Sequence, residues 1–317
     1  MSRARQILPG QFYLITRRCT QRQFLLRPDA DTNNAFTYCL VEAALRFEID
    51  VLLTVAESNH HHTVIFDRHG RCPQFVEHFH KMFARCQNAR LGRWENLWAA
   101  EEPCITRLLD RDAVLAKLIY VASNPVKDSL VERATQWPGT NGYRNLLAGR
   151  PLHARRPRHF FDAHGSMPAE VNLPLVIPDA LGSASALIAE LQAGVTAVEH
   201  AMRAHRASTG ARIVGRKRVL EQPWHASPTS LEPRRNLRPR FAGSTAVRLE
   251  ALRAFREFSA AYHDARESWL AGANVTFPPG TYWLARFAPV SVAPFVGSQL
   301  LGTLPSQNHS PLVPAVA

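Results

Sequence analysis

Two short apolar segments separated by a polar turn constrain this chain more than any other feature of its sequence. The first covers residues 49–55 and is rich in β-branched and apolar side chains, and the second ends at Asp67. Glu57, Ser58 and Asn59 stand between them and are typical turn residues. The pattern predicts two neighbouring strands joined as a buried hairpin.

The second segment begins with three consecutive histidines, His60, His61 and His62. Successive side chains of a strand point to opposite faces, so His60 and His62 are expected side by side and His61 on the other face. Two imidazoles held in this way form half of a divalent-metal site that suits Mn, Zn, Co or Ni and accepts Mg when oxygen ligands complete the shell. The alternative is a pair of strand-edge histidines bonded to the backbone.

Composition favours a polyanionic partner. The 317 residues carry 38 Lys and Arg against 26 Asp and Glu, a net charge of +12, and such an excess is most often found in proteins that bind nucleic acid. Charge alone does not separate DNA from RNA or from an acidic membrane face. No window approaches the roughly twenty apolar residues of a membrane span, and the N-terminus lacks the apolar core of a signal peptide. We therefore expect a cytoplasmic protein with no membrane partner.

The five cysteines form no CxxC pair and lie in the first third of the chain. An odd number without paired spacing indicates neither a disulfide framework nor a cysteine zinc site. Reduced, packed thiols are expected.

Residues 110–124 form the second informative stretch. Their apolar residues recur at helical spacing, and Pro125 is expected to end the helix after Asn124. Tyr120 falls almost opposite the centre of the apolar stripe, and Lys117, Tyr120 and Asn124 form one polar row on the free face. The alternative for Tyr120 is ordinary packing on the surface.

Other elements follow from the same patterns. A strand is expected over residues 12–20, and helices over 35–45 with a cap at 31–34, over 74–91, 183–206 and 248–270. His78 and His80 lie two apart on the helix 74–91, nearly on opposite sides, so they are expected to be solvated or packed rather than to share a metal.

The second half of the chain is expected to be a separate, basic part. We predict a catalytic domain over residues 8–150, a basic linker over 151–165, a basic helical extension over 166–287 and a disordered tail over 288–317. Phosphate-backbone contacts are expected along a cationic track, with Trp224, Phe241 and Trp283 available for base stacking. The track comprises Arg203, Arg206, Arg212, Arg216, Lys217, Arg218, Arg234, Arg235, Arg238 and Arg240.

Three motifs taken together resemble a known family. Residues 58–62, residues 120–126 and the turn 137–143 are similar in order and spacing to the REP-associated tyrosine transposases, relatives of the insertion-sequence-200-like single-tyrosine transposases in the HUH endonuclease group. The resemblance covers about residues 8–150. It implies an α+β fold of the ferredoxin-like HUH type, an antiparallel sheet flanked by helices, to which the basic and mainly helical C-terminal extension is fused.

The resemblance also implies the chemistry. His60, His62 and Asn124 are expected to hold Mg or Mn, and Tyr120 to attack a phosphodiester of single-stranded DNA beside a hairpin, leaving a 5′-phosphotyrosine. His61 departs from the family, which has a hydrophobic residue between the two histidines. A phenol with a pKa of about 10 needs nearby positive charge to ionise, from the metal or Lys117. Candidate DNA contacts are Arg17, Arg18, Arg22, Arg27, Lys117, Arg216, Lys217 and Arg218.

The expected protein is nucleoid-associated and acts as a monomer or homodimer. Two other functions stay open at the level of sequence. One is a DNA-hairpin-binding protein that descends from such a transposase and no longer cuts, which His61 and the long extension suggest. The other is a metal-dependent RNA hydrolase that uses water and forms no adduct.

Overall fold

A five-stranded sheet forms the centre of the molecule in the computed structural model, which describes residues 4–230 and 239–295. The strand order is β2-β3-β1-β4-β7. The first four strands are antiparallel neighbours, and β7 joins β4 in parallel. The expected α+β class, with a sheet flanked by helices, is confirmed, and β7 makes the sheet mixed rather than purely antiparallel. The strands are β1 Gln11–Arg18, β2 Ile49–Ala56, β3 His60–Asp67, β4 Cys104–Leu108 and β7 Phe241–Ala242.

The predicted hairpin is strands β2 and β3. Ala56 pairs with His61 and Val55 with His62, so the register places the histidines directly after the turn. Strand β3 is also paired along its whole length with β1. Because β3 has a neighbour on both sides, its backbone is fixed by hydrogen bonds at both edges.

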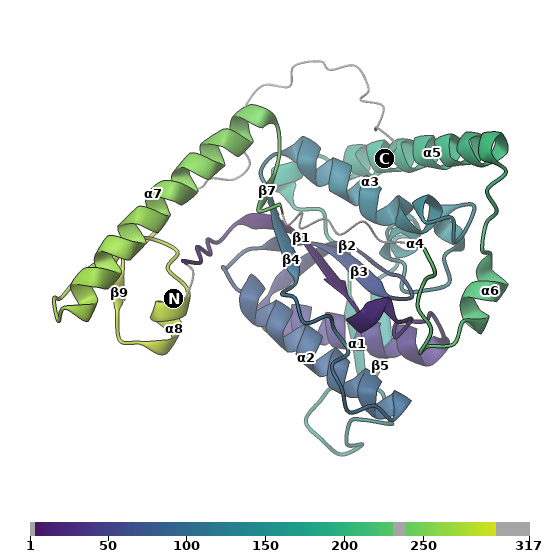
Figure 1. Cartoon of the computed structure of the whole chain (residues 1–317), viewed down its shortest axis with the longest axis horizontal. Helices are drawn as coiled ribbons and strands as arrows, with labels where there is room; N and C mark the ends of the chain where they lie inside the picture. The colour runs from purple at the N-terminus through teal and green to yellow at the C-terminus, as the bar shows by residue number, and fades with distance from the viewer. Residues whose placement is uncertain (1–3, 231–238, 296–317) are drawn as a thin grey trace.

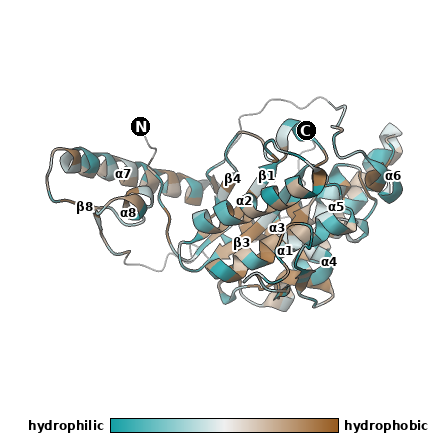
Figure 2. Cartoon of the chain, turned by 90° about the horizontal axis from the view of Figure 1, so that it is seen from below, coloured by the Kyte–Doolittle hydropathy of each residue, from teal (hydrophilic) through white to brown (hydrophobic). Residues whose placement is uncertain are grey.

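Helices cover both faces of the sheet (Figure 1). Helices α1 Ala30–Phe47 and α2 Cys72–Leu91 pack on one face, and α3 Arg111–Lys127 packs on the other, with α5 Ala184–Thr209 beside it. Alternate residues of β3 divide between the two cores: Ile65 joins the α1–α2 side, whereas Val64 and Phe66 join the α3 side. In Figure 2, the brown colour of hydrophobic residues is concentrated in the elements of this layered body.

Several helix boundaries differ from the expected ones, and two of these differences have a clear local cause. Helix α1 begins at Ala30, and its cap is Asp29, whose carboxylate accepts a hydrogen bond from Thr32 N at 2.8 Å. Helix α3 continues through Pro125 to Lys127. A proline in the last turn removes a single backbone donor, and the Asn124 carbonyl still accepts from Asp128 N at 3.0 Å. The prediction that Pro125 ends the helix was therefore wrong by one turn.

The C-terminal half is joined to the sheet and to α1. Strand β5 Leu152–Arg155 lies within the expected linker and pairs with β6 Glu170–Leu173, and the apolar residues of both strands pack in the α1–α2 core. The division into domains at about residue 150 stays a prediction. The remaining elements are η1 Thr20–Arg22, η2 Ala134–Gln136, α4 Gly142–Leu147, η3 Asp179–Leu181, α6 Arg216–Glu221, α7 Thr245–Leu270, β8 Thr276–Phe277, α8 Trp283–Phe287 and β9 Ser291–Val292.

Helix α7 extends away from the body, and α8 and β9 lie beside α7 (Figure 1). A small core of Phe258, Tyr262 and Phe277 holds this part together. Most of the expected tail, residues 296–317, lies outside the described residues, and so do Arg234, Arg235 and Arg238 of the cationic track. Among the described residues, no helix is both long and apolar enough to cross a membrane.

Gly142, the first residue of α4, lies against the backbone of β2. A Cβ at this position would stand 2.9 Å from both the N and the O of Thr54, and backbone atoms cannot move aside without disturbing the sheet. We expect Gly142→Ala to lower the free energy of unfolding by about 1–3 kcal/mol through overpacking, measured by urea denaturation. Gly165→Ala is the matched control, because its Cβ meets no atom closer than 3.4 Å; equal stability of the two variants would contradict the described packing.

Candidate active site

His60 and His62 project side by side from the face of β3 that is covered by α3, as the sequence predicts. Their ring centroids are 4.9 Å apart. His61 points to the opposite face and is completely buried. The strand alternation therefore sets two imidazoles on the α3 face and a single imidazole in the α1–α2 core.

His62 connects the sheet to α3. Its Nδ1 lies 2.7 Å from Thr16 Oγ1 on β1, and its Nε2 lies 3.4 Å from the Tyr120 hydroxyl. A neutral imidazole has one donor and one acceptor nitrogen. Burial, together with the positive potential of His60, His61 and Lys117, lowers the pKa of His62 well below its usual value. The ring is therefore neutral near pH 7 and suited to ligate a metal or accept a proton.

Tyr120 is the residue whose surroundings differ most from the expectation. It was expected on the free face of its helix, but it is partly buried between α3 and the sheet, with its ring 5.0 Å from that of His62. Helix α3 is covered by the sheet on one side and by α5 on another, so the polar row lies on the flank that faces β3. The Nζ atoms of Lys117 and Lys127 lie 5.5 Å and 5.1 Å from the ring centroid.

The electrostatics of Tyr120 oppose ionisation in the protein alone. Burial, followed by the negative charges of Asp128 and Glu57, raises the pKa of Tyr120 to about 12. The sequence predicts that positive charge from the metal or Lys117 favours the phenolate; in the folded protein, desolvation and the two carboxylates act in the opposite direction. A cation placed between the carboxylates and the phenol would reverse this balance.

Asn124 and Glu57 meet beside His60. Asn124 Nδ2 lies 2.8 Å from Glu57 Oε1 and 3.0 Å from His60 Nε2, while His60 Nδ1 lies 2.8 Å from Asn59 Oδ1. The predicted grouping of His60, His62, Tyr120 and Asn124 is therefore present in the folded chain. The role of each as a ligand or nucleophile stays a prediction.

Glu57, His60 and Asp128 bring one ligand atom each to within 4.8 Å of one another, which makes them a possible metal-binding group. Glu57 is buried, and its pKa is raised by desolvation and by the nearby Asp128 carboxylate. Two carboxylates held close together are unfavourable unless a proton or a cation lies between them. Nitrogen and carboxylate donors together fit Mn, Zn or Mg.

Glu57 and Asp128 are not among the site residues predicted from the sequence, because Glu57 is expected in a turn and the helix is expected to end at Asn124. The signal for Asp128 was its spacing, because it follows Asn124 by four residues and continues the polar row of the helix. The signal for Glu57 was its position three residues before His60 across a tight turn.

The predicted DNA contacts of β1 divide between the two faces of the sheet. Arg18 pairs across the strands with His60 and shares its face, whereas Arg17 pairs with His61 on the opposite face. Arg17 Nη2 also donates to Ala99 O at 3.4 Å. Of these two, only Arg18 borders the group around His60.

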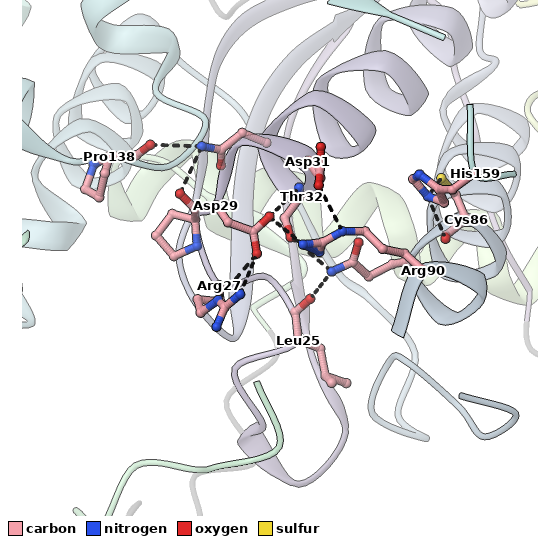
Figure 3. A network of polar contacts seen from close by, with 12 residues as sticks. Leu25, Arg27, Asp29, Asp31, Thr32, Cys86, Arg90, Pro138 and His159 are labelled. Carbon is pink, nitrogen blue, oxygen red and sulfur yellow. Dashed lines mark hydrogen bonds and ion pairs between the residues drawn. The ribbon is translucent and has the colours of Figure 1, made fainter. Parts of the chain in front are cut away.

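Arg27 belongs to a structural network at the start of α1 (Figure 3). Arg27 Nη2 lies 3.0 Å from Asp29 Oδ2, and Arg90 Nη2 lies 2.7 Å from Asp29 Oδ1. Both arginines thus neutralise the carboxylate that caps the helix. Arg22 donates to Ser230 O at 2.7 Å on the surface. Arg27 has a role in the fold whether or not it also contacts DNA.

The basic helix α6 passes beside the site. The residues before it are tied to the end of α3, since Val214 N donates to Ser129 O and Gly215 N donates to Leu130 O. Just after it, Gln222 Oε1 accepts a hydrogen bond from Ser58 Oγ in the β2–β3 turn at 3.5 Å. The side chains of α6 that were predicted to contact DNA are exposed, and they are Arg216, Lys217 and Arg218.

His61 is accommodated by a polar contact inside the α1–α2 core. Its Nε2 lies 2.9 Å from His80 Nε2, and its Nδ1 lies 3.1 Å from Thr63 Oγ1. Desolvation lowers the pKa of both His61 and His80 well below the usual value. His80 is therefore packed, and His78 Nε2 lies 2.7 Å from Glu42 Oε2. All five cysteines lie among the described residues and are free.

No protein-family model and no curated protein match this sequence. A REP-associated tyrosine transposase solved with a bound REP hairpin is 16% identical with a TM-score of 0.40, and the match covers 56% of this chain and all of that one. A protein of Deinococcus radiodurans R1, described provisionally as a transposase, is 15% identical with a TM-score of 0.27, and the match covers 33% of this chain and 84% of that one. A tRNA(His) guanylyltransferase of Saccharomyces cerevisiae is 11% identical with a TM-score of 0.31, and the match covers 47% of this chain and 69% of that one. With all three TM-scores below 0.5, no substrate or reaction is taken from these similarities.

The pKa of Tyr120 should respond to the exposed Asp128 carboxylate, whose charge is the largest that raises it. We expect Asp128→Asn to lower the pKa of Tyr120 from about 12 towards the ordinary value of about 10, because one negative charge is removed while burial remains. Ultraviolet difference titration of the metal-free protein, with Tyr120→Phe as the blank, measures the shift. Asp112→Asn, at the exposed start of the same helix, is the control and should leave the titration unchanged.

Acid stability should depend on His61. The unfolded chain binds a proton at this residue below about pH 6.5, whereas the buried ring stays neutral in the fold because its pKa is lowered. Stability therefore falls as the pH drops through 6.5. We expect His61→Leu to reduce the slope of unfolding free energy against pH between 6.5 and 5 by up to about 1.4 kcal/mol per pH unit. An unchanged slope in urea titrations would contradict a neutral, buried His61.

Proposed function

We propose that this chain is a metal-dependent transposase that nicks and rejoins single-stranded DNA at hairpin-associated repeats through a phosphotyrosine at Tyr120. One observation carries the proposal: the Tyr120 hydroxyl lies 3.4 Å from His62 Nε2, although 58 residues separate them, and His60 and Asn124 lie directly beside this pair. A phenol next to paired imidazoles and an amide is the arrangement that the sequence resemblance requires.

The donor set fits a divalent ion. His60 and His62 offer neutral nitrogens, and Glu57 and Asp128 offer carboxylate oxygens. The Asn124 amide presents its Nδ2 to Glu57 and His60, and a 180° rotation of the amide would present its oxygen instead. A bound Mg or Mn would polarise the scissile phosphodiester and offset the two carboxylates. The close approach of Glu57, Asp128 and His60 supports such an ion.

Tyr120 is the proposed nucleophile. Its phenolic oxygen forms a bond to phosphorus, the bond from phosphorus to the 3′ oxygen breaks, and the released strand leaves with a 3′ hydroxyl. A cation held by His60 and His62 would favour release of the phenolic proton to water, and the leaving 3′ oxygen would take up a proton from water. Thr16 holds the far side of the His62 ring. Attack of another 3′ hydroxyl on the phosphotyrosine reverses the step. Because the energy of the broken phosphodiester stays in the covalent link, rejoining needs no nucleoside triphosphate.

Basic side chains around the site supply contacts for the DNA backbone. Arg18 lies on the His60 face of the sheet, Lys117 and Lys127 flank Tyr120, and α6 adds an exposed basic helix beside the β2–β3 turn. The net charge of +12 makes the affinity for DNA strongly dependent on salt.

A hairpin-binding protein that does not cut is the second candidate. The raised pKa of Tyr120 favours it, because a phenol that stays protonated is a poor nucleophile. The two candidates share the DNA surface and differ only in the covalent step.

Covalent trapping separates the two candidates. A 3′-labelled single-stranded hairpin incubated with protein and Mn or Mg should give a denaturation-resistant protein–DNA adduct, read by gel electrophoresis. Tyr120→Phe removes the nucleophilic oxygen and should abolish the adduct while hairpin affinity changes less than about threefold, since only a hydroxyl is lost. His60→Ala should remove the adduct together with most of the Mn binding.

Tyr143→Phe is the matched control, because Tyr143 lies on α4 outside the site and should support adduct formation at the normal level. Tight hairpin binding without any adduct in the unchanged protein would favour the non-cutting candidate. Product formation that survives Tyr120→Phe would instead indicate hydrolysis by water.

A further inference from the structure

A cavity of about 380 Å³ lies on the sheet face opposite Tyr120. It opens between α2, the end of β1 and the C-terminal segment around α8. Its lining combines three cations with three large aromatic rings: Arg5, Arg17, Lys81, Trp98, Tyr282 and Trp283. None of these residues takes part in the site around Tyr120.

We propose that this cavity binds one unpaired nucleotide of a single-stranded nucleic acid, with the base against the aromatic wall and its phosphate beside the cations. The identity of the strand rests on the proposed function, which makes single-stranded DNA the substrate. The cavity would hold a nucleotide that flanks the one attacked by Tyr120, and it would add a second point of attachment to the strand.

The lining fits a nucleotide better than an apolar ligand. Trp283 is 37% exposed, so its ring is available for stacking, which every base provides regardless of sequence. The Trp98 indole N–H already donates to His80 O at 2.9 Å, which fixes that ring in the wall. Glu77 and Glu102 also line the cavity, but Arg286 lies 3.5 Å from Glu77, so positive charge prevails.

Strand β1 connects the cavity with the site around Tyr120. Arg17 and Arg18 are consecutive, so one side chain lines the cavity while the other shares the face of His60. Both stand at the same end of the sheet, where β1 ends and β3 begins. A strand that passes Arg18 on leaving the site needs only to turn around this end of β1 to reach Arg17.

The C-terminal segment completes the cavity. Ile7 N donates to Gly280 O at 2.9 Å, and Tyr282 N donates to Arg5 O at 3.3 Å, so the two distant segments form one wall. Arg286 Nη1 lies 2.8 Å from the Tyr282 hydroxyl. The part of the chain that follows α7 thus supplies a binding wall that the first 150 residues lack.

Binding of a fluorescent dT8 oligonucleotide, followed by anisotropy with EDTA present, tests the cavity without the metal-dependent step. We expect Lys81→Ala and Trp283→Ala each to weaken binding by about fivefold or more, as the loss of one stacked base or phosphate contact would. Arg85→Ala is the matched control: Arg85 is exposed on the same helix α2, one turn from Lys81, and does not line the cavity. It removes the same charge and should change affinity less than about twofold.

Equal effects of Lys81→Ala and Arg85→Ala would overturn the proposal, because they would indicate diffuse charge instead of a site. Competition by free dTMP as strong as that by dT8 would also overturn it in favour of a free-nucleotide site. Lys81 is exposed, so its variant keeps the fold. The test is independent of catalysis. If Lys81→Ala and Trp283→Ala leave dT8 binding unaffected while the Tyr120 adduct forms normally, this inference alone is removed. If no Tyr120 adduct forms while the two variants weaken dT8 binding as expected, the proposed function alone is removed.

Discussion

The double pairing of β3 is the constraint on which the site depends. Hydrogen bonds to β1 and β2 along both edges prevent the strand from rotating or slipping, and a slip of one residue would exchange its two faces. His60 and His62 would then enter the α1–α2 core, and His61 would face α3. The helical side chains Tyr120 and Asn124 meet the imidazoles only because this register is fixed.

The cost of this arrangement is electrostatic. The site holds a buried Glu57 beside Asp128 and a phenol whose pKa is raised to about 12. These groups destabilise one another in the protein alone, and the proposed divalent cation would relieve both the carboxylate repulsion and the resistance of the phenol to ionisation. In the proposed reaction, the same residues would make ionisation of the phenol depend on the metal.

The C-terminal half contributes to the body of the protein at several points instead of extending from it as a separate chain. Strand β7 lengthens the sheet, the segment around α6 connects the end of α3 with the β2–β3 turn, and α8 lies against the cavity beside α2. Each contact brings basic or aromatic side chains to the edges of the sheet, where a single strand could follow the surface.

The sequence alone determined the β2–β3 hairpin, the facing of the three histidines and the helical row of Tyr120 and Asn124, because strand and helix periodicities are local properties of the chain. Tertiary structure decided the rest. Coverage of α3 by both the sheet and α5 turned Tyr120 inward and raised its pKa, and the approach of the α3 end to the β2–β3 turn joined Asp128 to Glu57. Such contacts depend on which elements pack together, and no local pattern in the sequence records that.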